Sequence, residues 1–183
     1  SYIAPPIAGR LAMEVFMSPQ KGRYKEGKAM PAEMLEAKTE TIRASGLHIH
    51  IWRWPGKGKR IMLAHGWESN SGRWAVWIGH LKKEGYDITA VDAPAHGSSE
   101  GSRFSAVLYA KVLQEAISVY KPEVLIGHSA GGAIAFAIRQ HCEKSIAIIG
   151  LNAALNPFTG IAGWLFPFMA RLMSFQPFSS RLI

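Results

Sequence analysis

A glycine-x-serine-x-glycine motif, Gly127-His128-Ser129-Ala130-Gly131, lies between two apolar segments of the chain. Residues 124–126 before it have the composition of a buried strand, and residues 132–138 after it continue as a helix of small and apolar residues. A serine at a sharp strand-to-helix turn takes a strained backbone conformation, and flanking glycines let the chain segments pass closely. The motif therefore predicts that Ser129 is a nucleophile and that both glycines shape its turn.

A serine hydroxyl is a weak nucleophile and needs a base, usually a histidine that an acid orients. Downstream of Ser129 the sequence has a single histidine, His141, and a single carboxylate, Glu143. On a helix that begins near Ala130, His141 would lie about 16 Å along the axis, since each residue adds about 1.5 Å. A general base must lie within hydrogen-bond reach of the serine before its pKa matters. We therefore expect neither residue to activate Ser129.

The elements that must position this serine follow from an alternation of short apolar segments with segments of helical length. This alternation is typical of βαβ units in a parallel sheet. We also expect a hairpin that precedes the parallel strands, with its turn at Ser45-Gly46. The predicted strands are 39–44, 47–54, 60–64, 87–91, 123–126 and 145–149, and the predicted helices between the parallel strands are 72–84 and 105–120.

Loops at the carboxyl ends of parallel strands meet at one edge of a sheet. The loop after residues 60–64 begins His65-Gly66-Trp67, and its glycine permits a tight turn. The backbone N–H of Trp67 and that of Ala130 are candidate donors to a developing oxyanion, as acyl transfer requires. We expect His65 and His128 to shape the site rather than to catalyse.

The loop after residues 87–91 contains an acid and a histidine in the sequence Asp92-Ala93-Pro94-Ala95-His96-Gly97-Ser98-Ser99. Asp92 could orient a catalytic histidine. A short carboxylate beside a proline and a glycine also suits hydrogen bonds to its own turn, and we favour that role. We expect His96 to fix the same loop.

In this order and spacing the loops resemble the α/β-hydrolase family of lipase- and esterase-like proteins. The matching pieces cover about residues 39 to 150 and are His65-Gly66-Trp67, Trp74, Gly85-Tyr86-Asp87, residues 92–98 and residues 127–132. The resemblance implies an α/β fold with a mostly parallel sheet flanked by helices. It also implies that Ser129 is the nucleophile and that Trp67 and Ala130 supply the oxyanion hole.

The family's acid and histidine follow the serine, usually after the seventh and eighth strands. This sequence accounts for strands one to six, and strands seven and eight are missing. The loop after the sixth strand offers the amide of Asn152 in place of an acid. An apolar sixth strand at a sheet edge is a liability that natural sheets usually cover, so we interpret the chain as a C-terminally incomplete fragment.

Three parts are predicted along the chain. Residues 1–38 form an N-terminal helical extension with a basic connector, residues 39–150 the first part of the α/β-hydrolase core, and residues 151–183 the start of an apolar lid. Apolar lid residues recur at three and four positions, which is the spacing of an amphipathic helix. A lid both packs against a site and lines it, so we expect an apolar acyl substrate. The recurring residues are Ile161, Trp164, Leu165, Phe168, Met169, Leu172 and Met173.

Composition excludes several classes of function. The chain has 183 residues, of which 48% are hydrophobic and 19% charged, with a net charge of +8. Its basic residues are scattered except in residues 21–28, where glycines and a glutamate interrupt them, so we expect a solvated connector and no nucleic-acid partner. Prolines, glycines and asparagines in the uncharged segment 151–170 argue against a transmembrane span. We expect no cofactor and no metal site.

Localisation is predicted from the single cysteine and the first residues. Cys142 alone forms no intrachain disulfide framework, which fits a reducing compartment. Prolines and charges break the first apolar stretch, which therefore does not have the pattern of a signal peptide. We expect a cytoplasmic protein, and the sequence sets no oligomeric state.

Two functional hypotheses remain. In the first, the protein is a serine hydrolase that cleaves a carboxylic ester or related acyl compound through an acyl-enzyme on Ser129. Its acid and histidine then come from sequence beyond Ile183, and this chain alone is inactive. In the second, the protein is a non-catalytic α/β-hydrolase-like binding protein without a complete triad. The same fold also supports thioester and carbon–carbon hydrolysis, acyl transfer and cofactor-free peroxidation.

Overall fold

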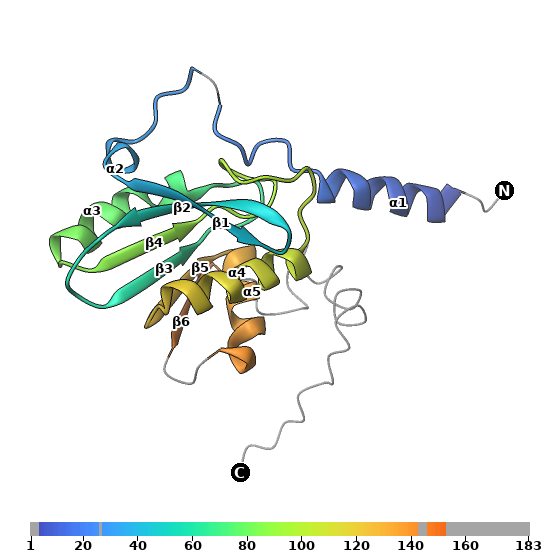
Figure 1. Cartoon of the computed structure of the whole chain (residues 1–183). Helices are drawn as coiled ribbons and strands as arrows, with labels where there is room; N and C mark the ends of the chain where they lie inside the picture. Colours follow the sequence, from blue (N-terminus) through green and yellow to red (C-terminus); the bar gives the residue numbers. More distant parts are fainter. Residues whose placement is uncertain (1–3, 26, 143–145, 153–183) are drawn as a thin grey trace, which may run out of the picture. The chain divides into compact units, whose positions relative to one another are not determined.

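The computed structural model describes residues 4–25, 27–142 and 146–152 (Figure 1). The predicted lid lies outside these residues except for its first two positions, and so does Glu143. The described strands form one six-stranded sheet in the order β1-β2-β4-β3-β5-β6. The strands are β1 Lys38–Ala44, β2 Leu47–Trp54, β3 Arg60–Ala64, β4 Asp87–Val91, β5 Val124–His128 and β6 Ala147–Leu151.

Helices connect these strands. α1 (Ala4–Met17) and the short α2 (Ala32–Leu35) precede the sheet. A 3-10 turn η1 (Ser71–Trp74) leads into α3 (Ala75–Lys83), and α4 (Ala106–Tyr120) connects β4 with β5. α5 (Ala130–Ile138) follows β5 and ends in a second 3-10 turn, η2 (Arg139–His141). None of the helices in the described part of the chain is both long and apolar enough to cross a membrane.

The predicted hairpin is present. β1 pairs antiparallel with β2 from Lys38 opposite Arg53 to Ala44 opposite Leu47. The two residues between them have positive φ, 50° at Ser45 and 81° at Gly46. Two consecutive positive φ angles suit the right-handed twist of a two-residue hairpin loop.

The remaining ladders position the site. β2 pairs antiparallel with β4, whereas β3 pairs parallel with β4 on one side and β5 on the other. Ala64 of β3 lies opposite both Val91 and Gly127. The loops that begin at residues 65, 92 and 129 therefore start side by side, and the predicted α/β-hydrolase fold is confirmed. β6 begins two residues later than predicted.

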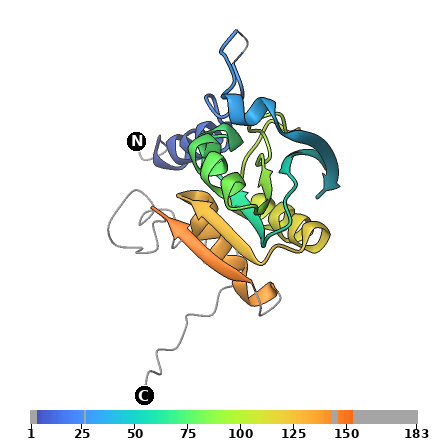
Figure 2. The ribbon, with the colours of Figure 1, turned by 90° about the vertical axis from the view of Figure 1, so that its left-hand side faces the viewer.

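Helices cover both faces of the sheet (Figure 2). Side chains of β3 alternate between the faces, since Met62 and Ala64 pack in one apolar cluster and Ile61 and Leu63 in the other. The first cluster includes α4 and α5 through Leu113 and Ile134, among others. The second includes buried side chains of α2 and α3, namely Met34 and Ile78.

The basic connector differs from the prediction at one point. Gly22 is buried rather than solvated, and its carbonyl accepts a hydrogen bond from the Gly97 N–H at 2.9 Å. The neighbouring Lys21, Arg23 and Lys25 are exposed. Glycine alone lets the connector approach this closely, because a Cβ at residue 22 would overlap the ring of His96.

Candidate active site

Ser129 occupies the junction of β5 and α5 with φ 51° and ψ −120°. This backbone conformation is strained for any residue with a Cβ and persists only where its surroundings enforce it. Two hydrogen bonds do so. The Ser129 N–H donates to the Leu151 carbonyl at 2.9 Å, and its carbonyl accepts from the Ala133 N–H at 3.0 Å. The strained turn predicted from the motif is thus observed.

The motif glycines stand where no side chain fits. A Cβ at Gly127 would lie 2.5 Å from the Gly132 Cα, and one at Gly131 would lie 2.5 Å from the Ala64 carbonyl oxygen. Gly66 is also tight, since a Cβ there would be 3.0 Å from the Ser129 Cβ and 3.5 Å from the Ala130 nitrogen. Loop 65–67 therefore packs directly on the turn that carries Ser129.

Replacing Gly131 by alanine is expected to lower the free energy of unfolding by about 1 to 3 kcal/mol, because backbone atoms of β3 cannot move aside for the new methyl group. Gly79→Ala is the matched control. Gly79 lies inside α3, its nearest atoms to an added Cβ are 3.8 Å away, and a gain of about 0.5 to 1 kcal/mol is expected there. Urea unfolding measures both changes. Equal effects of the two variants would contradict the steric argument.

Two backbone donors lie next to Ser129. Ala130 is the first residue of α5, whose first N–H groups have no acceptor within the helix. Neither the Ala130 nor the Trp67 N–H donates to an acceptor among the described residues. The positive end of a helix dipole also favours an anion. The two N–H groups predicted from the sequence as oxyanion donors are thus free to bind a ligand. The segments that carry them are in contact at Gly66.

His65 is fully buried, and both of its ring nitrogens have partners. Nε2 accepts a hydrogen bond from the Ala93 N–H at 2.9 Å, so Nδ1 carries the proton and donates to the Gly66 carbonyl at 2.7 Å. Burial lowers the pKa of His65 to about 4, which keeps the ring neutral. A ring with both nitrogens occupied joins the loop after β3 to the loop after β4 and has no free lone pair for Ser129.

His96 is held in the same way. Its Nε2 accepts from the Glu68 N–H at 3.0 Å, and its Nδ1 donates to the Pro94 carbonyl at 2.8 Å. Burial lowers its pKa as well. His128 is half-buried, and its pKa is lowered by burial first and by the Arg73 cation second. Its Nδ1 is buried and has no partner within the described residues.

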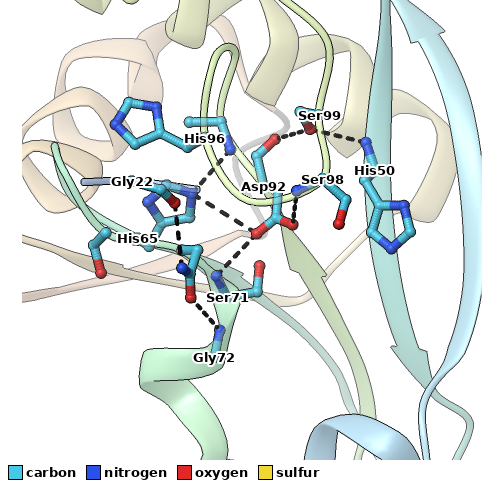
Figure 3. Close-up of polar contacts among 12 residues, drawn as sticks. Gly22, His50, His65, Ser71, Gly72, Asp92, His96, Ser98 and Ser99 are labelled. Carbon is cyan, nitrogen blue, oxygen red and sulfur yellow. Dashed lines mark hydrogen bonds and ion pairs between the residues drawn. The ribbon is translucent and has the colours of Figure 1, made fainter. Parts of the chain in front are cut away.

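Asp92 is the centre of a buried polar network (Figure 3). Its Oδ1 accepts from the Ser71 N–H at 2.9 Å, and its Oδ2 accepts from the Trp52 indole at 3.0 Å and the Ser98 N–H at 3.1 Å. The Ser98 contact is the turn role predicted for Asp92. Sequence reasoning missed the other two partners, because they lie 40 and 21 residues away on β2 and η1.

Asp92 also lies 4.0 Å from the Nε2 of His65. This is no ion pair, because that nitrogen carries no proton. The carboxylate is compensated by three N–H donors instead, which is how buried charges are tolerated. Asp92 therefore braces the loops around Ser129, and among the described residues it orients no catalytic base.

Ser129 has no hydrogen-bonded base among the described residues. Within them, no hydrogen bond joins a histidine to the Ser129 hydroxyl, and His141 is exposed in η2. The same part of the chain contains no group of three or more side chains that could hold a metal ion. The arrangement thus contains a strained serine and two free N–H donors, the parts that bind and attack a carbonyl.

A protein-family model described as "Serine aminopeptidase, S33" matches residues 56–179. Many solved α/β-hydrolase structures also match the fold. The chain belongs to the α/β-hydrolase family. The match begins after the β1–β2 hairpin, so it includes the loops around Ser129 and excludes the N-terminal extension.

Two relatives show how the α/β-hydrolase chain compares in sequence. It is 34% identical over 134 residues to the magnesium-chelatase 30 kDa subunit of Rhodobacter capsulatus, which covers 70% of this chain and 46% of the relative. It is 26% identical over 110 residues to a pimeloyl-[acyl-carrier protein] methyl ester esterase of Methylococcus capsulatus, which covers 60% and 42%. The chain thus matches less than half the length of each relative.

A thioesterase domain from the curacin biosynthetic pathway is similar in structure. Its TM-score is 0.61 at 22% identity, and the match covers 75% of this chain and 54% of that one. At this identity the likeness concerns the fold. Relatives and structural neighbours of this α/β hydrolase include esterases, thioesterases and epoxide hydrolases.

Proposed function

We propose that the protein is a serine hydrolase that cleaves a carboxylic ester or related acyl compound through an acyl-enzyme on Ser129. The observation that carries this proposal is the strained backbone of Ser129 at the junction of β5 and α5, beside two N–H groups without acceptors. Strain at a nucleophile exposes its hydroxyl and is retained for function. Similarity to an esterase supports an ester-type substrate.

The proposed reaction has two steps. The Ser129 Oγ attacks the carbonyl carbon while a base takes its proton, and the carbonyl oxygen becomes an oxyanion held by the N–H groups of Trp67 and Ala130. The base then returns the proton to the departing alcohol, and an acyl-enzyme remains. Water, deprotonated by the same base, attacks the acyl carbon. The bond to the Ser129 Oγ breaks, the base returns the proton to this oxygen, and the carboxylic acid leaves.

The base and its acid are proposed to lie in sequence beyond Ile183. His65 and His96 are excluded because both nitrogens of each ring are occupied. The chain matches less than half the length of its relatives, which leaves room for further family segments. Apolar spacing in residues 161–173 supports an apolar acyl group as substrate. A cytoplasmic location is proposed from the single cysteine.

Labelling with a fluorophosphonate tests this function. In the full-length protein we expect stoichiometric phosphonylation at Ser129, located by peptide mass spectrometry, and none in Ser129→Ala. The 183-residue chain alone should turn over activated esters slowly, because it lacks the proposed base. A folded full-length protein that does not label would contradict the proposal. It would favour the alternative, a binding protein without a complete triad, which rests on the lack of a base near Ser129 among the described residues.

A further inference from the structure

Residues 16–23 comprise the last two residues of α1 and the connector that follows it, and they lie outside the segment that the family model matches. They are nevertheless packed on two loops at the site edge of the sheet, the loop 65–70 after β3 and the loop 92–101 after β4. We call residues 16–23 the N-terminal strap. Its contacts with loop 65–70 include Trp67, the proposed oxyanion donor, and residues that follow it.

Three contacts join the strap to loop 65–70. The ring of Phe16 stacks on the ring of Trp67, with centroids 4.7 Å apart and planes 18° apart. The Gln20 N–H donates to the Glu68 carboxylate at 2.9 Å. The Gly22 carbonyl accepts from the Asn70 side-chain amide at 3.2 Å. The strap thus holds the loop at positions 67, 68 and 70.

A second set of contacts joins the strap to loop 92–101. The Gly22 carbonyl also accepts from the Gly97 N–H, and the Arg23 guanidinium donates to the carbonyls of Ser99 at 3.0 Å and Gly101 at 2.6 Å. One carbonyl, that of Gly22, therefore joins both loops. This explains why the connector is docked at Gly22.

The strap contacts a residue with a strained backbone, Glu68. Its φ is 50°, an unfavourable value for a residue with a Cβ, and it directly follows Trp67. Its N–H is held by the Nε2 of His96, and its carboxylate is held by the strap. The His96 ring in turn lies against Gly22. A strained conformation persists only where its surroundings enforce it. Here one neighbour, Gln20, belongs to the strap, and the other, His96, packs against it.

We propose that the N-terminal strap is a positioning element of the active site, which aims the Trp67 N–H at the oxyanion by holding Glu68 in its strained conformation. This inference rests on the proposed function of Ser129. It assigns catalytic importance to a segment outside the matched family region. Gly22 and Glu68 act through Trp67 and are positioning residues.

Gly22→Ala tests the strap, because the new methyl group would displace His96, whose two nitrogens are both bonded. In the full-length protein we expect kcat for p-nitrophenyl butyrate to fall by about 10²-fold, since small misplacements of catalytic groups have effects of that size, while KM stays within about threefold. The Glu68 amide should exchange its hydrogen faster. Gly9→Ala is the matched control, because Gly9 lies in α1 with no atom within 4 Å of an added Cβ.

Glu68 supplies a second pair of variants if Gly22→Ala fails to fold. Glu68→Ala removes the acceptor of the Gln20 N–H and should lower kcat by about tenfold, the equivalent of about 1.4 kcal/mol. Glu68→Gln keeps a carbonyl acceptor and should restore most of that loss. An unchanged kcat in Glu68→Ala, or an equal loss in both variants, overturns the strap proposal.

Labelling at Ser129 distinguishes a strap without a catalytic role from a serine that is not a nucleophile. If the wild-type protein labels at Ser129 and the Glu68→Ala variant labels at the same rate, the strap has no catalytic role although the serine does. If the wild-type protein does not label, the proposed function falls, and with it the catalytic role of the strap. Hydrogen exchange at Glu68 then still reports whether the strap holds the loop.

Discussion

Replacing Ser129 by glycine is expected to abolish ester hydrolysis and, at the same time, to stabilise the protein. The nucleophile is lost, which should lower kcat by at least about 10⁴-fold. The strained φ of 51° becomes acceptable, since glycine has no Cβ. Relief of about 1 to 3 kcal/mol of strain outweighs the extra chain entropy of glycine, so a net gain of about 1 kcal/mol in the free energy of unfolding is expected.

Ser129→Ala separates the two effects. Alanine also lacks the hydroxyl, so its loss of activity should equal that of the glycine variant. It keeps a Cβ, so its stability should stay close to that of the wild-type protein. Urea unfolding and p-nitrophenyl ester hydrolysis of the full-length variants measure both quantities. A glycine variant less stable than the alanine variant would show that the turn is not strained, and residual turnover near the wild-type rate would show that another residue is the nucleophile.

Asp92→Ala is expected to destabilise the protein by about 3 to 5 kcal/mol, because each buried donor left without an acceptor costs about 1 to 3 kcal/mol. Three N–H groups would lose their acceptor, the buried ones of Trp52 and Ser71 and the partly buried one of Ser98. Asp92→Asn retains one oxygen and should cost less, about 1 to 3 kcal/mol, since one donor then faces the amide group. Both variants should also lose hydrolysis, because the loops around Ser129 would no longer be braced.

The sequence contains one other aspartate, Asp87, which provides the control. Its carboxylate pairs with Arg53 at 2.9 Å and is 20% exposed. Asp87→Ala should cost no more than about 1 kcal/mol, as partly exposed ion pairs usually do. Denaturant unfolding compares the variants. Equal losses at the two aspartates would mean that Asp92 is an ordinary ion-pair or turn residue and not the centre of the network.

Local patterns in the sequence determined the elements around the site. The alternation of apolar segments and helical segments predicted the parallel sheet, and Ser45-Gly46 predicted the hairpin turn, because these signals depend on neighbouring residues only. The motif around Ser129 predicted the strained turn for the same reason. The limits of β6 were less accurate, since its register is set by pairing with β5.

Tertiary structure alone decided the partners of the polar side chains. Nothing near Asp92 in the sequence indicates that the Trp52 indole will reach it, because the two residues meet only when β2 pairs with β4. The docking of Gly22 depends on Gly97, about 75 residues away. The neutral rings of His65 and His96 each depend on a backbone donor 28 residues away. The sequence by itself therefore determined that Ser129 sits on a strained turn. Only the folded chain decided which distant groups hold the loops around it, because hydrogen bonds in a buried network depend on position in space and not on distance along the chain.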